Sequence, residues 1–132
     1  MDELVEFLRA RLEEDEAAAK ACASAPWAIE IPPMIHVSVQ ARRDNKWKWG
    51  TLGYVATVER DEDRAHIARH DPARVLREVE AKRQILAAHA LNGWVCSTCD
   101  NEEVDQDYPC LTLRLLALPY VDHPDYRAEW RP

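Results

Sequence analysis

Three of the four cysteines in this chain, together with one histidine, fall within 22 residues. The four side chains are His89, Cys96, Cys99 and Cys110, in the order His-x6-Cys-x2-Cys-x10-Cys. Structural zinc sites are tetrahedral, and thiolate sulfurs and imidazole nitrogens fill all four positions. The two-residue gap between Cys96 and Cys99 lets both sulfurs turn toward one ion. The pattern therefore predicts a structural Cys3His site for Zn²⁺, or for another thiophilic metal.

Three other interpretations of these cysteines remain open. They can be reduced core or loop residues, with His89 bonded to a carbonyl group at a helix end. A redox-active CxxC pair is less favoured, because thioredoxin-like motifs open a helix after a strand, whereas this pair follows the helix terminator Asn92-Gly93. An iron–sulfur cluster would recruit Cys22 as its fourth sulfur ligand. Otherwise Cys22 is expected to be a small buried apolar residue at a helix end.

The loop around the cysteines favours the metal. Residues 92–108 contain few apolar side chains but five acids, at positions 100, 102, 103, 105 and 107. Hydrophobic burial alone cannot hold such a loop in place, whereas metal binding adds its free energy to that of folding. The same acids make a poor surface for phosphate, so they weaken the alternative of a zinc finger that binds DNA.

Length and charge limit the remaining possibilities. The 132 residues suit a single compact domain, 1–132, with a zinc-stapled C-terminal segment, 89–132. The formal charge of −7, from 24 acids and 17 bases, opposes a general attraction to nucleic acids. The chain begins with acids rather than with a basic and apolar leader, and it has no apolar run that spans a bilayer. We expect a small acidic cytoplasmic protein, since clustered cysteines in a reducing cytosol more often bind metal than form disulfides.

The apolar periodicity predicts an α+β fold. Asp2 is placed to cap an N-terminal helix of about 20 residues. Alternating residues over 35–41 and 52–58 predict an antiparallel β-hairpin joined through 42–50. Asp71-Pro72 is a strong start signal for a long central helix, which Asn92-Gly93 ends. The hairpin is expected to pack on this helix, and a CxxC zinc knuckle and short C-terminal helices follow it.

Two histidines form a second candidate metal site. His66 and His70 lie four residues apart in a short helix that is expected before Asp71. Two histidines one turn apart can share a metal, which would suit a metal-dependent hydrolase. However, no glutamate occupies the HExxH position. The simpler interpretation is that one histidine packs against the hairpin while Asp71 only caps the next helix.

The hairpin tip is a candidate contact for nucleic acid or for a partner. It interleaves basic and aromatic side chains, namely Arg42, Arg43, Lys46, Trp47, Lys48 and Trp49. Such a surface can stack bases and contact phosphates. Because of the overall charge, a solvated tip whose tryptophans fold back on the core is the favoured interpretation.

Two sequence blocks carry a family resemblance. The segments HIARHDPARVLREVEAKRQILAAH (66–89) and YPCLTLRLLALPYVDHPDYRAEWRP (108–132), with the CxxC motif between them, resemble a family of small actinobacterial and actinophage proteins of unknown function. The resemblance implies a stand-alone cytosolic protein and agrees with a site at His89, Cys96, Cys99 and Cys110. It implies no activity.

The expected function follows from these observations. The sequence has no GxSxG motif, P-loop or dinucleotide fingerprint, so the case for an enzyme is weak. We therefore expect a non-enzymatic binding, adaptor or regulatory protein with a protein partner, encoded on or near mobile DNA such as a phage genome. The alternatives are a nucleic-acid-associated regulator that uses the hairpin tip, and a hydrolase that uses His66 and His70. The sequence makes no prediction of the oligomeric state.

Overall fold

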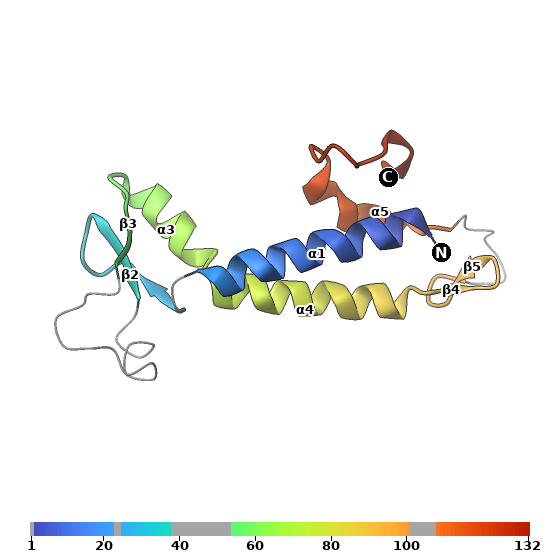
Figure 1. The fold of residues 1–132 in the computed structure, drawn as a ribbon, viewed down its shortest axis with the longest axis horizontal. Coiled ribbons are helices and arrows are strands. Elements are labelled where there is room, and N and C mark those ends of the chain that lie inside the picture. The colour runs from blue at the N-terminus through green and yellow to red at the C-terminus, as the bar shows by residue number, and fades with distance from the viewer. Residues whose placement is uncertain (1, 23–24, 38–53, 101–107) are drawn as a thin grey trace. The chain divides into compact units, whose positions relative to one another are not determined.

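The computed structural model describes residues 2–22, 25–37, 54–100 and 108–132 (Figure 1). These residues fall into two compact units, one built from 1–14 and 79–132 and the other from 15–78. The α+β class is confirmed: the described residues form four α-helices, a small antiparallel sheet and a two-stranded hairpin. The prediction of one domain over the whole chain stays a prediction.

The first unit begins with helix α1 (Glu3–Ala21), of which residues 3–14 belong to it. The Asp2 carboxylate caps this helix, because its Oδ1 accepts hydrogen bonds from the backbone N–H groups of Leu4 at 2.9 Å and Val5 at 3.2 Å. The predicted N-cap is therefore confirmed. The apolar face of this part of α1 is buried, and it consists of Leu4, Val5, Phe7, Leu8 and Leu12.

The rest of the first unit positions the cysteines. The second half of helix α4 (Pro72–Ala88) leads into a short antiparallel hairpin, β4 (Leu91–Asn92) and β5 (Val95–Cys96). Gly93 has φ of +65°, which only glycine adopts without strain, so it closes this tight turn. Helix α5 (Leu111–Ala117) follows, with the 3₁₀ turns η1 (Leu118–Tyr120) and η2 (Ala128–Trp130).

An aromatic cluster holds the C-terminal segment against α1. The Phe7 ring is at its centre, with ring centroids 5.0 Å from Trp130, 5.6 Å from His123, 6.1 Å from Tyr126 and 6.3 Å from Tyr120. Trp130 is itself buried, near the end of the chain. This contact fixes the C-terminal residues on the same unit that carries the cysteines.

The second unit contains a three-stranded antiparallel sheet in the order β1-β2-β3. Its strands are β1 (Trp27–Ala28), β2 (Met34–Val37) and β3 (Tyr54–Thr57). The predicted hairpin is present as β2 and β3, in which Ile35 pairs with Ala56, whereas its connection, 38–53, lies outside the described residues. Strand β1 was not expected, because two residues are too short to show a period.

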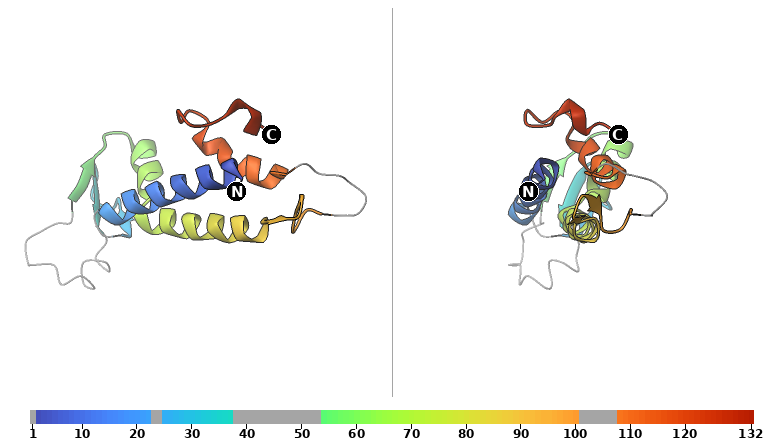
Figure 2. Two further views of the ribbon diagram at one scale, coloured as in Figure 1. Left: turned by 45° about the vertical axis from the view of Figure 1, so that its right-hand side comes forward. Right: turned by 90° about the vertical axis from the view of Figure 1, so that its right-hand side faces the viewer.

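Helix α3 (Asp61–Arg69) covers this sheet, since it packs against β1 and β2 (Figure 2). The sequence indicated a shorter helix here, over 64–69, and expected one of its histidines to pack against the hairpin, whereas His66 and His70 are both exposed. Arg64 anchors α3, because its buried guanidinium donates to the carbonyl group of Val58 at 2.7 Å. Helix α4 is tied to the sheet at its first turn, through Asp71. None of the described helices combines the length and the apolar character that a bilayer crossing requires.

Substitution of Asp71 by alanine is expected to destabilise the second unit. The buried Asp71 carboxylate caps α4 by accepting from the Arg74 N–H at 2.9 Å, and it also accepts from the Trp27 N–H in β1 at 3.2 Å. Loss of an N-cap costs about 1 kcal/mol, and an unsatisfied buried donor costs about 1–3 kcal/mol. Urea unfolding should show Asp71→Ala less stable by about 2–4 kcal/mol, the sum of these two losses. The two bonds use different oxygens, Oδ1 for Arg74 and Oδ2 for Trp27, so Asp71→Asn, which has a single acceptor oxygen, can keep the cap but not the bond to Trp27 as well. Its loss should therefore lie between zero and that of Asp71→Ala, and a loss equal to that of Asp71→Ala would contradict the capping role.

Candidate metal centre

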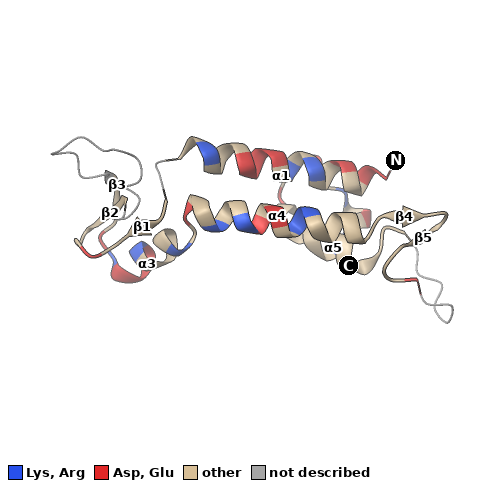
Figure 3. Cartoon of the chain, turned by 90° about the horizontal axis from the view of Figure 1, so that it is seen from below, with Lys and Arg blue, Asp and Glu red and all other residues tan. Residues whose placement is uncertain are grey.

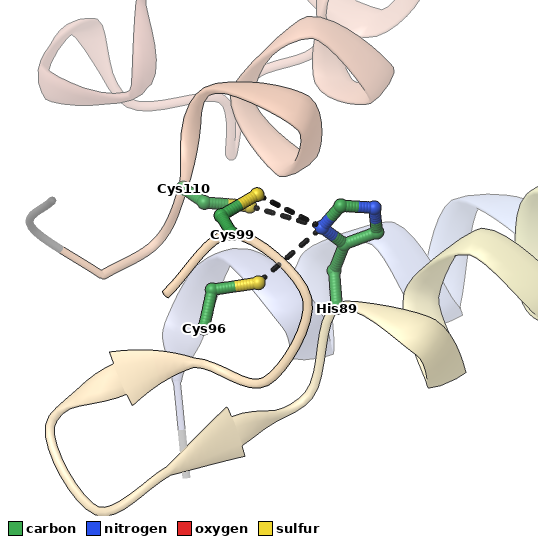
Figure 4. A group of neighbouring side chains, drawn as sticks. All are labelled: His89, Cys96, Cys99 and Cys110. Atoms are coloured by element: carbon green, nitrogen blue, oxygen red, sulfur yellow. Dashed lines mark hydrogen bonds between the residues drawn. The ribbon is translucent and has the colours of Figure 1, made fainter. Parts of the chain in front are cut away.

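Four side chains from separate elements meet at the end of helix α4 (Figure 4). His89 directly follows α4, Cys96 belongs to β5, Cys99 lies in the turn after it, and Cys110 immediately precedes α5. The Nδ1 atom of His89 lies 3.3 Å from the Cys96 Sγ, 3.4 Å from the Cys99 Sγ and 3.5 Å from the Cys110 Sγ. All four atoms lie within 4.8 Å of one another. The structure thus brings together the four residues that the sequence selected.

Hydroxyl groups of residues that follow the hairpin hold it on the end of α4. The carbonyl group of Ala88 accepts from Ser97 Oγ at 2.8 Å and also from the Thr98 hydroxyl. The backbone N–H of Ser97 donates to the carbonyl oxygen of Ala90 at 2.8 Å, and the Tyr108 hydroxyl donates to that of His89 at 3.4 Å. The last carbonyl groups of a helix have no partner within the helix. Here the residues between the cysteines supply partners, and so they fix the hairpin next to His89.

Cys110 reaches the cluster from the start of α5. It is the N-cap residue, with extended dihedrals of φ −67° and ψ 163°, but its side chain makes no capping hydrogen bond. Its sulfur faces the Nδ1 of His89 instead. Cys96 and Cys110 are buried, whereas His89 and Cys99 are partly exposed. The site therefore lies at the rim of the core.

The contacts around His89 are those of a metal site rather than of a hydrogen-bond network. One imidazole nitrogen has a single hydrogen or lone pair to share, yet three sulfurs surround Nδ1 at 3.3 to 3.5 Å. A tetrahedral ion with bonds of about 2.3 Å to sulfur and about 2.0 Å to nitrogen separates nitrogen from sulfur by about 3.5 Å. The observed distances match that separation. These four residues can hold a metal ion.

The cysteine pKa values show how the sulfurs affect one another. Burial raises the pKa of Cys99 to about 11, and the neighbouring sulfurs of Cys96 and Cys110 add to the rise. Burial also acts to raise the pKa of Cys96, but hydrogen bonds from the backbone of Thr98 and Cys99 and from the side chains of Cys110 and Cys99 together outweigh it, so this pKa lies below its ordinary value. Cys96 is thus the better thiolate. A cation is needed before all three sulfurs carry charge together.

Metal binding is expected to release protons at neutral pH. Because the pKa of Cys99 is about 11 in the metal-free fold, its thiol is protonated at pH 7 and must lose that proton to bind a metal. Metal affinity should rise with pH, by about tenfold per pH unit for each proton released. Titration calorimetry in two buffers of different ionisation enthalpy should give different apparent heats, and identical heats would contradict the prediction.

The raised pKa of Cys99 also makes the stability of the metal-free protein depend on pH, and it does so in the opposite direction to metal affinity. The raised pKa of Cys99 favours the neutral thiol in the fold, so this group stabilises the metal-free fold at pH values below the ordinary 9.0. That contribution is lost as the pH rises from there through about 11. In the metal-bound protein the stabilisation from the bound ion should instead increase with pH over the range in which Cys99 would otherwise be protonated.

The other candidate residues do not join this cluster. His66 and His70 are exposed, with ring centroids 4.4 Å apart, and the Nδ1 of His70 bonds to the carbonyl oxygen of His66 at 2.8 Å. Over the described ranges, the His89 cluster is the one group of three or more potential ligands. A second metal at His66 and His70 therefore stays a prediction. The hairpin-tip residues Arg42, Arg43, Lys46, Trp47, Lys48 and Trp49 lie outside the described residues.

Cys22 differs from the prediction. It was expected to be a small buried residue, but it is exposed, and its thiol donates to the carbonyl oxygen of Ala18 at 3.3 Å. The prediction was right about the helix end, since α1 ends at Ala21, but wrong about burial, since the thiol there is exposed. The metal cluster contains three sulfurs and no fourth, which removes the support for an iron–sulfur cluster that uses Cys22.

Sequence reasoning missed the residues that support the ligands. Ser97 and Thr98 were treated as spacers within the CxxC motif, although both cap α4. Their short hydroxyl side chains were the available signal, since serine and threonine often bond to nearby backbone groups. Tyr108 was missed because its partner, the carbonyl group of His89, lies 19 residues earlier in the chain.

The comparisons with known proteins give a family and no function. No curated protein and no solved structure matches the chain. One family matches residues 1–132, and its description is "Family of unknown function (DUF6221)". This match confirms the resemblance to a family of unknown function, while the actinobacterial and actinophage hosts stay a prediction. Since the match covers the whole length, the chain belongs to the DUF6221 family of unknown function.

Proposed function

We propose that this protein binds one structural Zn²⁺ through His89, Cys96, Cys99 and Cys110, and that it acts as a non-enzymatic binding protein with a protein partner. The observation that supports the zinc site most strongly is the position of three sulfurs 3.3 to 3.5 Å from one imidazole nitrogen. The ion would join the end of α4, the β4–β5 hairpin and the start of α5. We place the protein in the cytosol, where the four cysteines, all free thiols, stay reduced.

The donor set favours zinc over other metals. Thiolate ligands select Zn²⁺, Cu⁺ or iron–sulfur clusters, whereas Mg²⁺ and Ca²⁺ prefer oxygen. A tetrahedral set of three sulfurs and one nitrogen suits Zn²⁺, which needs no redox partner. The protein fills all four positions, so no position is left for a water nucleophile or a substrate. This supports a structural role rather than catalysis.

The hairpin held by the ion supports a binding role. The side chain of Trp94, in the turn after Gly93, is 92% exposed, and its neighbour Leu91 is half exposed. Tryptophan is enriched at the energetic centres of protein interfaces. Strands β4 and β5 carry no charged residue (Figure 3). The sequence from 84 to 113 has five acids and no lysine or arginine, which disfavours a phosphate-bearing partner.

Metal analysis tests the zinc site directly. Protein purified without chelators should contain about one zinc per chain, and replacement by Co²⁺ should give the visible absorption of a tetrahedral thiolate site. Cys99→Ser should weaken metal binding and change the Co²⁺ spectrum, while His66→Ala should leave both unchanged. Protein without zinc, or an octahedral Co²⁺ spectrum, would refute the proposed site. A second metal that His66→Ala removes would instead favour the hydrolase.

A further inference from the structure

The three sulfurs of the metal centre differ in their access to solvent. Cys96 and Cys110 are 2% and 1% exposed, whereas Cys99 is partly exposed. A reagent in solution therefore reaches the cluster through the sulfur of Cys99. Cysteines that respond to oxidants combine an accessible sulfur with a second thiol beside it. The cluster supplies that second thiol, because its sulfurs all lie within 4.8 Å of one another.

Cys96 is better placed than Cys110 to form a disulfide with Cys99. The backbone N–H of Asp100 donates to the carbonyl oxygen of Cys96 at 3.0 Å, which closes one helix-like turn that contains both Cys96 and Cys99. Side chains three residues apart on such a turn are neighbours. Cys110 belongs to the start of α5, and ten residues of chain lie between it and Cys99. Because a short loop closes at the lowest entropy cost, the thiol that stays nearest to Cys99 without an ion is that of Cys96.

We propose that the metal centre senses hydroperoxides, and that oxidation joins Cys96 to Cys99 and releases the metal; this rests on the zinc site proposed above. The Cys99 thiolate attacks the O–O bond, so its sulfur becomes a sulfenic acid, and the oxygen that leaves takes up a proton to give an alcohol, or water from hydrogen peroxide. The Cys96 thiolate then attacks this sulfur. The S–S bond forms, and the hydroxide that leaves takes up a second proton. The two sulfurs lose two electrons, which reduce the peroxide.

Oxidation replaces a link between elements by a link within one turn. The ion joins the end of α4, the hairpin and the start of α5, whereas the disulfide lies inside residues 96–99. Thiolates bind zinc and disulfide sulfurs carry no charge, so only His89 and Cys110 remain as ligands, which is too few for a structural site. The first turn of α5 thus loses its link to the hairpin that carries the exposed Trp94. In a reducing cytosol this change is transient, because cellular thiols reduce the disulfide again.

The zinc-loaded full chain with Cys22→Ser tests the proposal, because this substitution removes the one thiol outside the cluster. Zinc content is measured first, and hydrogen peroxide is then added in small molar excess. A chromogenic indicator follows the released zinc, and mass spectrometry after alkylation assigns the disulfide. About one zinc per chain should be released, with Cys96 joined to Cys99 and Cys110 still open to alkylation. A thiol reductant followed by zinc should restore the original zinc content.

Hydrogen exchange of the oxidised chain shows which link is lost. The backbone N–H of Arg114 donates to the carbonyl oxygen of Cys110 at 3.2 Å, in the first turn of α5, and it should lose protection. The N–H of Asp100 lies in the turn that the disulfide closes, so it should keep its protection. The opposite pattern would contradict the exchange of one link for the other.

Two matched variants identify the sulfur that reacts. Cys99→His and Cys110→His each keep four ligands of the kinds that zinc accepts, but the first removes the accessible thiol and the second a buried one. Cys99→His should release zinc at least about tenfold more slowly than Cys22→Ser, because its remaining thiols are buried. Cys110→His should release it about as fast as Cys22→Ser. If either histidine variant does not bind zinc, the disulfide assigned in Cys22→Ser decides.

The outcomes separate this proposal from the zinc site itself. A chain that contains no zinc before oxidation refutes the zinc site, and the present proposal with it. Zinc that stays bound in hydrogen peroxide, or a product without the Cys96–Cys99 disulfide, overturns the sensing proposal and leaves the zinc site intact. Release from Cys99→His as fast as from Cys22→Ser does the same.

Discussion

Cys96→Ser is expected to release the metal and to unfold the hairpin that Cys96 belongs to. Within residues 89–100 the only buried side chain is that of Cys96, and those of His89, Val95 and Cys99 are partly exposed. Apolar burial therefore contributes little to holding this segment. Structural zinc provides on the order of 10 kcal/mol in small zinc-dependent folds. That is comparable with the whole stability of a domain, about 5–15 kcal/mol, so the loss should be large.

Hydrogen exchange and thermal unfolding measure this loss. The backbone N–H groups of Ser97 and Asp100 bond to the carbonyl groups of Ala90 and Cys96 at 2.8 and 3.0 Å, and both should lose protection in Cys96→Ser. A strong chelator should have the same effect on the native chain. The α1 amides should keep much of their protection, because α1 has its own buried apolar face.

Cys22→Ser is the matched control for this prediction. It removes a thiol of the same kind, but the Cys22 side chain is exposed, and among the described residues its hydrogen bond goes to the carbonyl oxygen of Ala18, four residues earlier. Its melting temperature and metal content should equal those of the native chain. If both serine variants behave alike, or if the chelator leaves the exchange of Ser97 unchanged, the metal does not hold the hairpin.

The parts of this structure that depend on residues close in the sequence could be predicted from it. The Asp2 cap involves only the nearby N–H groups of Leu4 and Val5. The metal ligands lie within 22 residues, and their spacing in the sequence was enough to identify all four as one site. The start of α4 was also predictable, because Asp71 bonds to Arg74, three residues later. In each case the side chain has a strong preference for one local role, either capping a helix or binding a metal.

The parts that depend on distant residues could not be predicted. The second bond of Asp71 goes to Trp27, 44 residues earlier, and it shows that this carboxylate also anchors a strand. Strand β1 exists only through its pairing with β2, since Trp27 and Ala28 have no pattern of their own. The exposure of Cys22 likewise depends on what packs around the end of α1. The pattern of neighbouring residues in the sequence does not predict any of these three features.

Phe7→Ala is expected to be among the most destabilising single substitutions in the first unit. The ring of Phe7 is nearly fully buried, and its four aromatic neighbours all come from the C-terminal segment, 120–130. Removing a buried phenylalanine side chain costs about 3–5 kcal/mol, because the neighbours cannot close the cavity. The guanidinium of Arg11 also lies 5.1 Å from the centre of this ring and loses that contact. Urea unfolding should therefore show a loss of about 3–5 kcal/mol, with a weaker near-ultraviolet signal from the ordered aromatic rings.

Phe7→Leu separates apolar volume from ring geometry. Leucine keeps most of the buried volume but cannot make the edge-to-face contacts with Tyr126 and His123, which are worth about 0.5–1.5 kcal/mol per pair. Its loss should be roughly half that of Phe7→Ala. Both variants should still bind one zinc per chain, since Phe7 is not one of the four ligands, and the metal and the aromatic cluster would then stabilise the C-terminal residues independently. A loss below about 1 kcal/mol in Phe7→Ala would mean that residues 120–130 are not anchored on α1 through this ring.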